Sequence, residues 1–309
     1  MRRAAYNVLS HALSEAEGGT ESFDPSAPLP TPFGRGLRRA GFAQGACVAV
    51  LLISVLMTAC GAIDPLPDVA LPPDPTPTQA PLAVDTGWLS VSAGIETREL
   101  SILHKGRPDR LLIARVDPSL ASFHVLYDPI DPRHVREWID AREARLVING
   151  GFFDPDKRAL GLVIAGGEAF GRTYEGLGGL FGVQAGQVQI RSLILEPYRQ
   201  DEVFDQMVQS YPTLLVGDGA INDQIRDDGR VAPRSVVGID RGGRVVFVVS
   251  PQPTFSLTDL AAWLAQSDLD LDAALNLDGG TSAGLMVRTA DGVWGINSWV
   301  EVPVVILVR

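Results

Sequence analysis

Ala-Leu-Asn-Leu-Asp-Gly-Gly-Thr-Ser-Ala-Gly-Leu, residues 274–285, joins an apolar run to an acid, paired glycines and two hydroxyls. The residues from Ala273 to Leu277 have the apolar character of a buried strand, which predicts that they pair in a sheet. Gly279 and Gly280 allow backbone angles that other residues disfavour, so a ligand can approach the main chain closely there. Asp278 then stands at the end of the strand and faces that ligand. Taken alone, the segment is equally compatible with an Asp that caps a Gly-Gly turn.

The composition is that of a globular protein with enough chain for a sizeable core: 309 residues, of which 46% are apolar and 20% are charged. The formal net charge is -11. Proteins that bind nucleic acid through its phosphates depend on clustered Lys and Arg, which this chain lacks. We therefore expect no nucleic-acid partner, and we attribute the acidity to solubility.

Residues 35–60 have the outline of a secretory signal peptide. Three arginines precede an apolar run from Ala46 to Met57, and Thr58-Ala59-Cys60-Gly61 follows. The run of about 12 residues is shorter than the roughly 20 that span a bilayer, and small residues precede Cys60 as at a cleavage site. This pattern resembles a bacterial lipoprotein signal, which predicts lipidation at Cys60 and an exported protein anchored in a membrane on its extracytoplasmic side. Cleavage without lipid and an uncleaved anchor are the alternatives.

Composition divides the chain into three parts. Residues 1–60 form a polar N-terminal extension followed by the lipoprotein-type signal peptide. Residues 61–86 are dense in proline, which favours extended chain and predicts a tether between membrane and domain. Residues 87–309 keep a globular composition throughout, which predicts one domain.

Short apolar runs rich in β-branched residues dominate that domain and predict strands. They are Leu100–Leu103, Arg110–Val116, Ser122–Tyr127, Arg145–Ile148, Gly179–Val183, Val188–Ile190, Thr213–Val216, Ser235–Ile239, Val245–Val249 and Val302–Val308. Helical spacing of apolar residues occurs near residues 135–139, 203–208 and 260–264. Few helices among many strands predict an α+β fold: a single domain with a central mixed or mostly antiparallel sheet and a few flanking helices.

A second segment, residues 146–154, repeats the design of the first. An apolar run leads into Asn149 and the paired glycines Gly150 and Gly151. Asn149 and Asp278 are therefore each expected at a strand end beside flexible, donor-rich backbone, which suits the binding of sugar hydroxyls or phosphate oxygens. A turn-forming Asn is the alternative.

Two further segments carry polar residues at strand ends. Arg234 opens a predicted strand, and its planar fork can hold two phosphate oxygens at once. A solvated surface pair is the alternative for this arginine. Ser210 and Tyr211 precede another strand and turn, where they either line a sugar pocket or only form the turn.

Known motifs for metals and nucleophiles are absent from the sequence. It has no His-Glu-x-x-His, Gly-x-Ser-x-Gly, P-loop or Cys-x-x-Cys pattern. His104, His124 and His134 lack the spacing of metal ligands, and residues 154–157 offer too few oxygens for calcium. The sequence therefore assigns no metal ligand, and no cofactor is firmly implied by it, while a divalent cation stays open.

Five segments, in this order and spacing, resemble the phosphodiester glycosidase family over about residues 95–308. They are Asn149–Asp154, Ser210-x-Pro212 with Leu214-Leu215, Pro233–Ser235 with Gly238-Ile239, Leu257–Ala261, and Asn276–Ser282. The family includes the lysosomal enzyme that removes N-acetylglucosamine from a phosphodiester to uncover mannose 6-phosphate, together with many bacterial members. The resemblance implies a hydrolase that cleaves the bond between a sugar's anomeric carbon and phosphate in a glycosyl phosphodiester, with the cell envelope as the expected source.

The candidate residues suit that chemistry. Asp278 is the candidate general base or nucleophile, and Asn149 would orient the sugar or the water. Arg234 would bind the phosphodiester with help from backbone N–H groups of the glycine pairs, because phosphate needs charge stabilisation more than protonation to leave. A second carboxylate is expected from Asp154 or Glu168. The residues expected to bind substrate are Gly150, Gly151, Gly279, Gly280, Thr281, Ser282 and Ser210.

Two other functions compete with glycosidase activity. One is a non-catalytic lipoprotein that binds envelope glycans through the same glycine-flanked cleft. The other is a metal-dependent phosphodiesterase that cuts the P–O bond. The expected partners are accordingly a glycosyl phosphodiester or envelope glycan, and the membrane through an N-terminal lipid.

Overall fold

The computed structural model describes residues 84–174 and 176–309 of the protein. The expected signal peptide, the lipidation site Cys60 and the tether as far as residue 83 lie outside these residues. The described part is mostly β, with 48% in strands, 9% helical and two α-helices.

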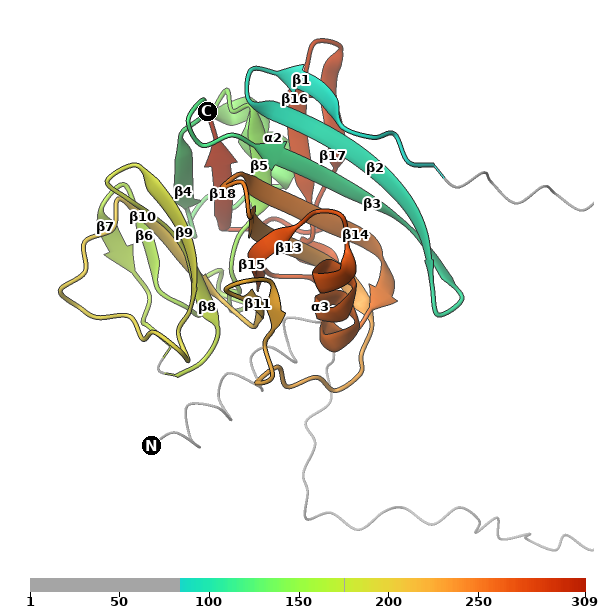
Figure 1. The fold of residues 1–309 in the computed structure, drawn as a ribbon. Helices are drawn as coiled ribbons and strands as arrows, with labels where there is room; N and C mark the ends of the chain where they lie inside the picture. The colour runs from blue at the N-terminus through green and yellow to red at the C-terminus, as the bar shows by residue number, and fades with distance from the viewer. Residues whose placement is uncertain (1–83, 175) are drawn as a thin grey trace, which may run out of the picture. The chain divides into compact units, whose positions relative to one another are not determined.

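The strands form three sheets, which can be followed by their labels in Figure 1. The order of the eight-stranded sheet is β1 (Leu89–Ser92), β2 (Ile95–His104), β3 (Arg107–Val116), β14 (Val245–Phe255), β13 (Ala232–Asp240), β15 (Leu271–Asn276), β11 (Thr213–Val216), β12 (Ala220–Ile221). A five-stranded sheet has the order β7 (Glu168–Phe170), β6 (Val163–Ala165), β10 (Gln206–Ser210), β8 (Gly179–Gln184), β9 (Gln187–Ser192). The other has the order β17 (Gly292–Ile296), β16 (Leu285–Thr289), β5 (Leu146–Asn149), β18 (Val304–Val308), β4 (Phe123–Tyr127).

The predicted α+β class with one central sheet is wrong. The ten predicted strands are all present, but they are distributed over three sheets in which every neighbouring pair runs antiparallel. Antiparallel strands connect through short turns and need no crossover helix. The domain therefore contains more strands and fewer helices than the apolar runs alone indicate.

One of the three predicted helices is a strand. The apolar residues at 203, 204, 207 and 208 have helical spacing, yet residues 206–210 form β10. This strand lies between β6 and β8, and all five of its residues are buried. A strand covered on both faces loses the alternation of apolar and polar residues that identifies a half-exposed strand, so periodicity cannot distinguish it from a buried helix.

The three sheets share one core. Phe123 of β4 shows this most directly, because its ring centroid lies 6.1 Å from that of Phe181 in β8 and 6.5 Å from that of Phe247 in β14. These three buried phenylalanines come from three different sheets, and aliphatic side chains of all three sheets pack around them. Burial of this apolar surface holds the ends of strands from different sheets in fixed positions.

Two of the three predicted helices are present, and each packs an apolar face on the sheets. α2 (Val135–Ala141) buries Trp138 and Ile139 against β5, β16 and β18. α3 (Leu257–Gln266) buries Leu260 and Leu264 against the eight-stranded sheet, and Figure 1 shows it beside β11 and β14. Neither helix is long and apolar enough to cross a membrane, and no other helix in the described residues is either.

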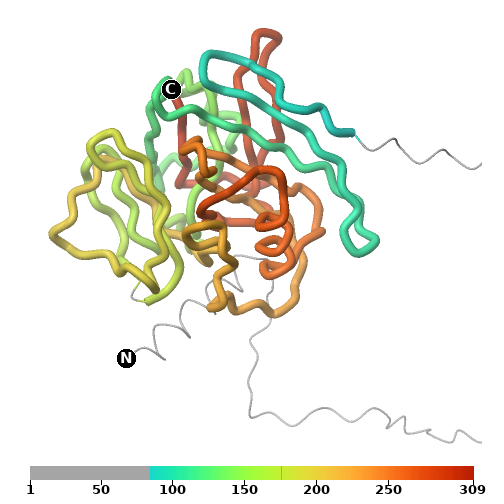
Figure 2. The backbone as a smooth tube through the Cα atoms, viewed as in Figure 1, coloured from blue at the N-terminus to red at the C-terminus, as the bar shows by residue number. Residues whose placement is uncertain are grey.

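The β2–β3 hairpin extends the large sheet toward the first described residues, and Figure 2 shows its long continuous path. Arg98 of β2 donates to Asp85 at 2.8 Å and 2.7 Å and to Asp268 at 3.0 Å and 2.9 Å. Hydrogen bonding to Arg98 lowers the pKa of Asp85 to about 2. This arginine therefore attaches the start of the described chain to the sheet.

Candidate active site

Two strand ends from different sheets meet at Asp278. The backbone N–H of Asp278, two residues after β15, donates to the carbonyl of Gly150, just after β5, at 3.0 Å. In return, Asn149 Nδ2 donates to the carbonyl of Asp278 at 2.7 Å. The two glycine-flanked turns predicted from the sequence are therefore adjacent.

The Asn149 side chain is fully buried and makes its contacts inside the protein. Its Oδ1 accepts from Ser235 Oγ at 2.7 Å and from the N–H of Gly284 at 3.1 Å, while its Nδ2 holds Asp278. Its exposed fraction is 0%. Asn149 thus fixes the main chain that carries Asp278, whereas the sequence analysis assigned it to the sugar or the water.

Replacing Asn149 should therefore reduce stability. Asn149→Ala leaves the Ser235 hydroxyl and two backbone groups without their partner, which we expect to lower the free energy of unfolding by about 2–4 kcal/mol. Urea denaturation of both proteins measures this difference. Asn297→Ala is the matched control, because Asn297 Oδ1 accepts a single bond, from the N–H of Arg136, and we expect a loss of about 1 kcal/mol or less. Full stability with lost activity would instead make Asn149 a substrate contact.

Arg234 lies directly across from Asp278. β13 pairs with β15 through Val236 and Asn276, and the N–H of Leu277 donates to the carbonyl of Ser235 at 2.8 Å. The next pair in this register is Arg234 and Asp278. Each is only 3% exposed. A buried cation and a buried carboxylate thus lie opposite each other on neighbouring strands.

The Arg234 side chain is held in a defined path. Its Nε donates to the carbonyl of Phe255 at 3.3 Å and its Nη2 to that of Arg230 at 2.9 Å. It passes Gly279, where a Cβ atom would lie 3.8 Å from Arg234 Cδ and 2.7 Å from the carbonyl of Pro233. Glycine at 279 therefore permits the close approach of this turn to β13.

The two glycine pairs differ in what their backbones can offer a ligand. The N–H of Gly150 donates to the carbonyl of Val304 at 2.8 Å, so this predicted phosphate donor is engaged in the fold. A Cβ atom at Gly151 would lie 2.5 Å from the carbonyl of Gln209, so that glycine allows packing. By contrast, no acceptor for the N–H groups of Gly279 and Gly280 is found within residues 84–174 and 176–309.

The turn after Asp278 forms a single turn of 3₁₀-helix, residues 280–282. Gly280 has φ +56°, in the left-handed region that favours glycine. Thr281 is exposed, and Ser282 is buried with its N–H donating to the carbonyl of Gly279 at 3.1 Å. Of the two hydroxyl residues in this turn, Thr281 is therefore the one at the surface.

The predicted Ser210–Tyr211 segment also reaches this region. Asn276 Nδ2 donates to the carbonyl of Tyr211 at 2.8 Å, which joins the end of β10 to β15. Ser210 is fully buried, and within the described part of the chain its hydroxyl has no hydrogen-bond partner. The four candidate segments of the sequence thus converge.

Tyr174 is a further candidate for this site, and no pattern in the sequence indicated it. It is 8% exposed, and its hydroxyl has no hydrogen-bond partner among the residues that the structure describes. Burial and the negative charge of Asp278 raise the pKa of Tyr174, so the phenol lies within electrostatic reach of that carboxylate and keeps its proton. The only signal in the sequence is a tyrosine between Gly171 and Gly176, which is common in loops.

Neighbouring groups hold the Tyr174 ring in place. Its backbone N–H donates to Gln209 Oε1 at 2.9 Å. A Cβ atom at Gly161 would lie 2.9 Å from the ring carbon Cζ, so glycine at that position leaves room for the ring. The phenol is therefore held in a fixed position within electrostatic reach of Asp278.

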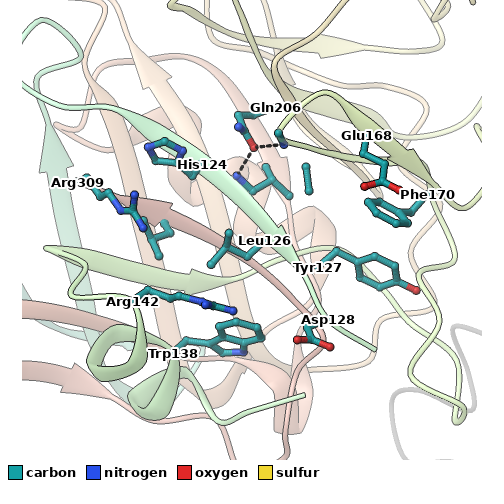
Figure 3. A pocket seen from close by; sticks show the side chains of 14 residues that line it. His124, Leu126, Tyr127, Asp128, Trp138, Arg142, Glu168, Phe170, Gln206 and Arg309 are labelled. Atoms are coloured by element: carbon teal, nitrogen blue, oxygen red, sulfur yellow. Dashed lines mark hydrogen bonds between the residues drawn. The ribbon is translucent and has the colours of Figure 1, made fainter. Parts of the chain in front are cut away.

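Neither candidate for a second carboxylate joins Asp278. Asp154 Oδ1 accepts from the N–H of Arg158 at 2.8 Å and closes a turn. Glu168 lines another cavity, shown in Figure 3, whose lining includes neither Asp278 nor Arg234. Within the described residues, no group of three His, Cys, Asp or Glu side chains is placed to hold a metal ion. The chemistry available at Asp278 is that of a carboxylate, a neutral phenol and an arginine.

Comparisons with known proteins agree with the family resemblance in the sequence. The phosphodiester glycosidase family model matches residues 142–309, more than half of the chain. The uncharacterized protein YigE of Escherichia coli K12 is 30% identical over 147 residues, 44% of this chain and 56% of YigE. The chain therefore spans little more than half the length of this relative.

Solved structures share the fold at low sequence identity. The catalytic domain of zebrafish N-acetylglucosamine-1-phosphodiester alpha-N-acetylglucosaminidase, auto-inhibited by its pro-peptide, has a TM-score of 0.55 at 19% identity, covering 72% of this chain and 85% of that one. A hypothetical protein from Synechocystis has a TM-score of 0.55 at 15% identity, covering 70% and 62%. With the family model matched over more than half of its length, the chain belongs to the phosphodiester glycosidase family.

Proposed function

We propose that this protein hydrolyses the bond between the anomeric carbon of a sugar and phosphate in a glycosyl phosphodiester. Its membership of a family of glycosidase-type hydrolases supports the reaction class. The observation that carries the proposal is the placement of Arg234 opposite Asp278 on neighbouring strands, both buried. A phosphodiester sugar needs both a cation at the leaving phosphate and a carboxylate at the reacting carbon.

The reaction balances without a cofactor. Water provides the oxygen that ends on the anomeric carbon, the bond from that carbon to the bridging oxygen breaks, and this oxygen leaves with the phosphate as a phosphomonoester. Arg234 stabilises the negative charge that develops on the departing phosphate. Asp278 acts on the oxocarbenium-like centre, as base toward water or as nucleophile toward carbon.

Tyr174 is assigned as the protonated partner of Asp278. A phenol that stays neutral can donate a hydrogen bond to the Asp278 carboxylate or to a sugar oxygen beside it. Because the pKa of Tyr174 is raised, this donor is retained at neutral and moderately alkaline pH. It supplies the donor function for which Asp154 and Glu168 are not placed.

The experiment is to incubate the protein with a panel of sugar-1-phosphodiesters in water enriched in oxygen-18. Appearance of the label in the released sugar supports cleavage between carbon and oxygen. Label in the phosphate product instead supports a P–O phosphodiesterase. Retention of envelope polymers without hydrolysis of any substrate in the panel supports the glycan-binding alternative. The anomeric configuration of the first-formed sugar, read by NMR, separates the two roles of Asp278, because a nucleophile gives retention and a base gives inversion.

We also propose that the protein acts on the cell envelope as an exported lipoprotein. The signal-like segment before Cys60 motivates this. Cys60→Ser is expected to abolish incorporation of labelled palmitate and to change the membrane-bound fraction on cell fractionation. Cys47→Ser is the matched control and should leave labelling unchanged, since Cys47 lies within the apolar run. Equal labelling of the Cys60→Ser protein would refute lipidation there.

Trp299 is the candidate contact for a sugar ring of the substrate. It is 82% exposed, whereas the other four tryptophans are buried or half-buried. The backbone N–H of Trp299 donates to the carbonyl of Thr281 at 2.8 Å. Thr281 lies three residues after Asp278. Lys157 Nζ donates to the carbonyl of Glu301 at 2.7 Å, so the loop of residues 297–301 is also held from the turn that follows residues 146–154. An exposed indole on a fixed loop suits stacking against a sugar.

Removing this indole should weaken substrate binding. We expect Trp299→Ala to raise KM about fivefold with little change in kcat, which corresponds to about 1 kcal/mol of stacking, and Trp299→Phe to retain most of it. Steady-state kinetics measure the split. Leu195→Ala removes an equally solvent-exposed apolar side chain elsewhere and serves as the control. An unchanged KM in Trp299→Ala would show that the indole does not contact the substrate.

A further inference from the structure

A cavity of about 390 Å³, called here the second cavity, has neither Asp278 nor Arg234 in its lining. Its walls come from β4, the β6–β7 hairpin, β10 and the C-terminal end of α2. Its size falls in the range of small-molecule sites, roughly 300–1,000 Å³. It is therefore large enough for a monosaccharide with a phosphate group.

Charged side chains of both signs line this cavity. Figure 3 shows Arg309 on the side of His124, Arg142 over Trp138, Glu168 beside Phe170 on the opposite side, and Asp128 between Trp138 and Tyr127. Among the described residues, none of these four side chains forms a salt bridge, although many other charged side chains do. The cavity thus keeps two cations and two carboxylates apart, and a ligand with a matching separation of charge and polar groups can bridge them.

Aromatic side chains form one wall of the cavity, and hydrogen bonds hold its walls together. The rings of Tyr127 and Phe170 lie side by side with centroids 5.1 Å apart, on the side of Glu168. Gln206 Oε1 accepts from the N–H groups of Val125 at 2.9 Å and Gly166 at 3.2 Å, which joins the opposite walls. An aromatic surface of this kind suits the C–H face of a sugar ring.

Arg142 is also held in position. The Arg142 guanidinium lies 5.6 Å from the centroid of the Trp138 ring, a cation–π arrangement. Trp138 is fixed in turn, because its Nε1 donates to the carbonyl of Val302 at 3.0 Å. Burial and the charge of Arg309 lower the pKa of His124, so this neighbouring imidazole is neutral at neutral pH. Two arginines therefore supply the positive charge in this cavity.

We propose that this cavity is a second binding site, for a phosphorylated sugar. The phosphate lies between Arg142 and Arg309, the sugar ring packs on Tyr127 and Phe170, and sugar hydroxyls donate to the carboxylates. The choice of a phosphorylated sugar over another ligand with both charges, such as an amino acid, rests on the proposed function.

The test uses two tryptophans as local reporters in the full chain labelled with ¹⁵N at its indoles. Trp138 lines the second cavity, and Trp299 is bonded to the turn that follows Asp278. Glucose 1-phosphate is titrated into the Asp278→Asn variant, so that it is not hydrolysed. We expect the Trp138 signal to shift at ligand concentrations up to about 10 mM. Inorganic phosphate alone and glucose alone should each shift it less at the same concentration.

Variants assign the two halves of the ligand. Arg142→Gln should raise the dissociation constant of glucose 1-phosphate, as reported by Trp138, by about tenfold, because the phosphate loses a charged donor. Phe170→Ala should also raise the dissociation constant of glucose 1-phosphate, while the affinity for inorganic phosphate is unchanged. Arg107→Gln removes an exposed arginine outside the cavity and should change neither.

Three results overturn the proposal. In the first, the Trp138 signal does not shift while the Trp299 signal does. This result refutes the second binding site and leaves the proposed function intact. Another is equal binding by the wild type and Arg142→Gln. The third is a larger shift of Trp138 by an amino acid such as lysine than by glucose 1-phosphate, which assigns a different ligand. Conversely, binding at Trp138 by a protein that hydrolyses no phosphodiester would retain the cavity site and refute only the catalytic proposal.

Discussion

Asp278→Asn is expected to reduce kcat on a sugar-1-phosphodiester by about 10³-fold or more while the domain still folds. The substitution keeps the size and the backbone contacts of residue 278, including the bonds to Gly150 and Asn149. It removes the negative charge and the basicity that either proposed role requires. The loss should appear in kcat and kcat/KM together, since the carboxylate acts on the transition state.

Asp272→Asn provides the control on the same strand. Asp272 lies at the other end of β15, where its Oδ1 accepts from the N–H of Asp218 at 2.7 Å, and an amide oxygen can accept that bond as well. Its activity should equal that of the wild type. Circular dichroism and thermal unfolding establish that both variants fold. Unaltered turnover by a folded Asp278→Asn protein would remove Asp278 from the mechanism.

Arg234→Met should lower kcat/KM on phosphodiesters by about 10²–10³-fold, the typical effect of losing one preorganised donor at developing charge. The effect should depend on the substrate. An aryl glycoside such as a p-nitrophenyl sugar carries no phosphate, so its hydrolysis should be little affected by Arg234→Met and strongly affected by Asp278→Asn. Arg234→Lys keeps the charge but loses the planar fork, and should be intermediate.

The comparison of these substrates separates a catalytic arginine from a structural one. Arg234 is buried and bonded to two backbone carbonyls, so a loss of stability would lower the rates on both substrates equally. Arg241→Gln, just beyond the other end of β13, is the control and should change neither rate. Equal losses on phosphodiester and aryl glycoside in Arg234→Met would refute a role at the phosphate.

The segments of the site were predictable because each carries a local signature. An apolar run followed by a polar residue and paired glycines predicts a strand end where backbone is accessible, and both Asn149 and Asp278 occupy such ends. Arg234 at the start of a β-branched run was predictable for the same reason. What such a signature leaves undetermined is the direction of a side chain. Asn149 turns into the protein to hold Asp278, a result that requires Ser235 of β13 and Gly284, which precedes β16.

Tyr174 and Glu168 show that local sequence does not reveal which site or cavity a side chain faces. Nothing near Tyr174 in the sequence distinguishes it from a loop tyrosine, and its relation to Asp278 depends on how the chain folds between the sheets. Glu168 follows paired glycines, as Asp278 precedes a pair, yet it lies on an edge strand beside Phe170 in a separate cavity. Spacing along the chain carries no information on which cavity a carboxylate faces.

The sequence by itself determined the ten strands recognised by their β-branched runs, two helices and four segments of the candidate site, because these depend on residues close together in the chain. Only the tertiary structure decided that the strands form three antiparallel sheets, that residues 206–210 are a strand, and that Tyr174 accompanies Asp278. The physical reason is the shared core around Phe123, which links sheets through contacts between distant residues. Burial on both faces also removes the periodic pattern by which a strand is recognised. Asp278, placed by a local pattern at a strand end, therefore receives its neighbours from packing.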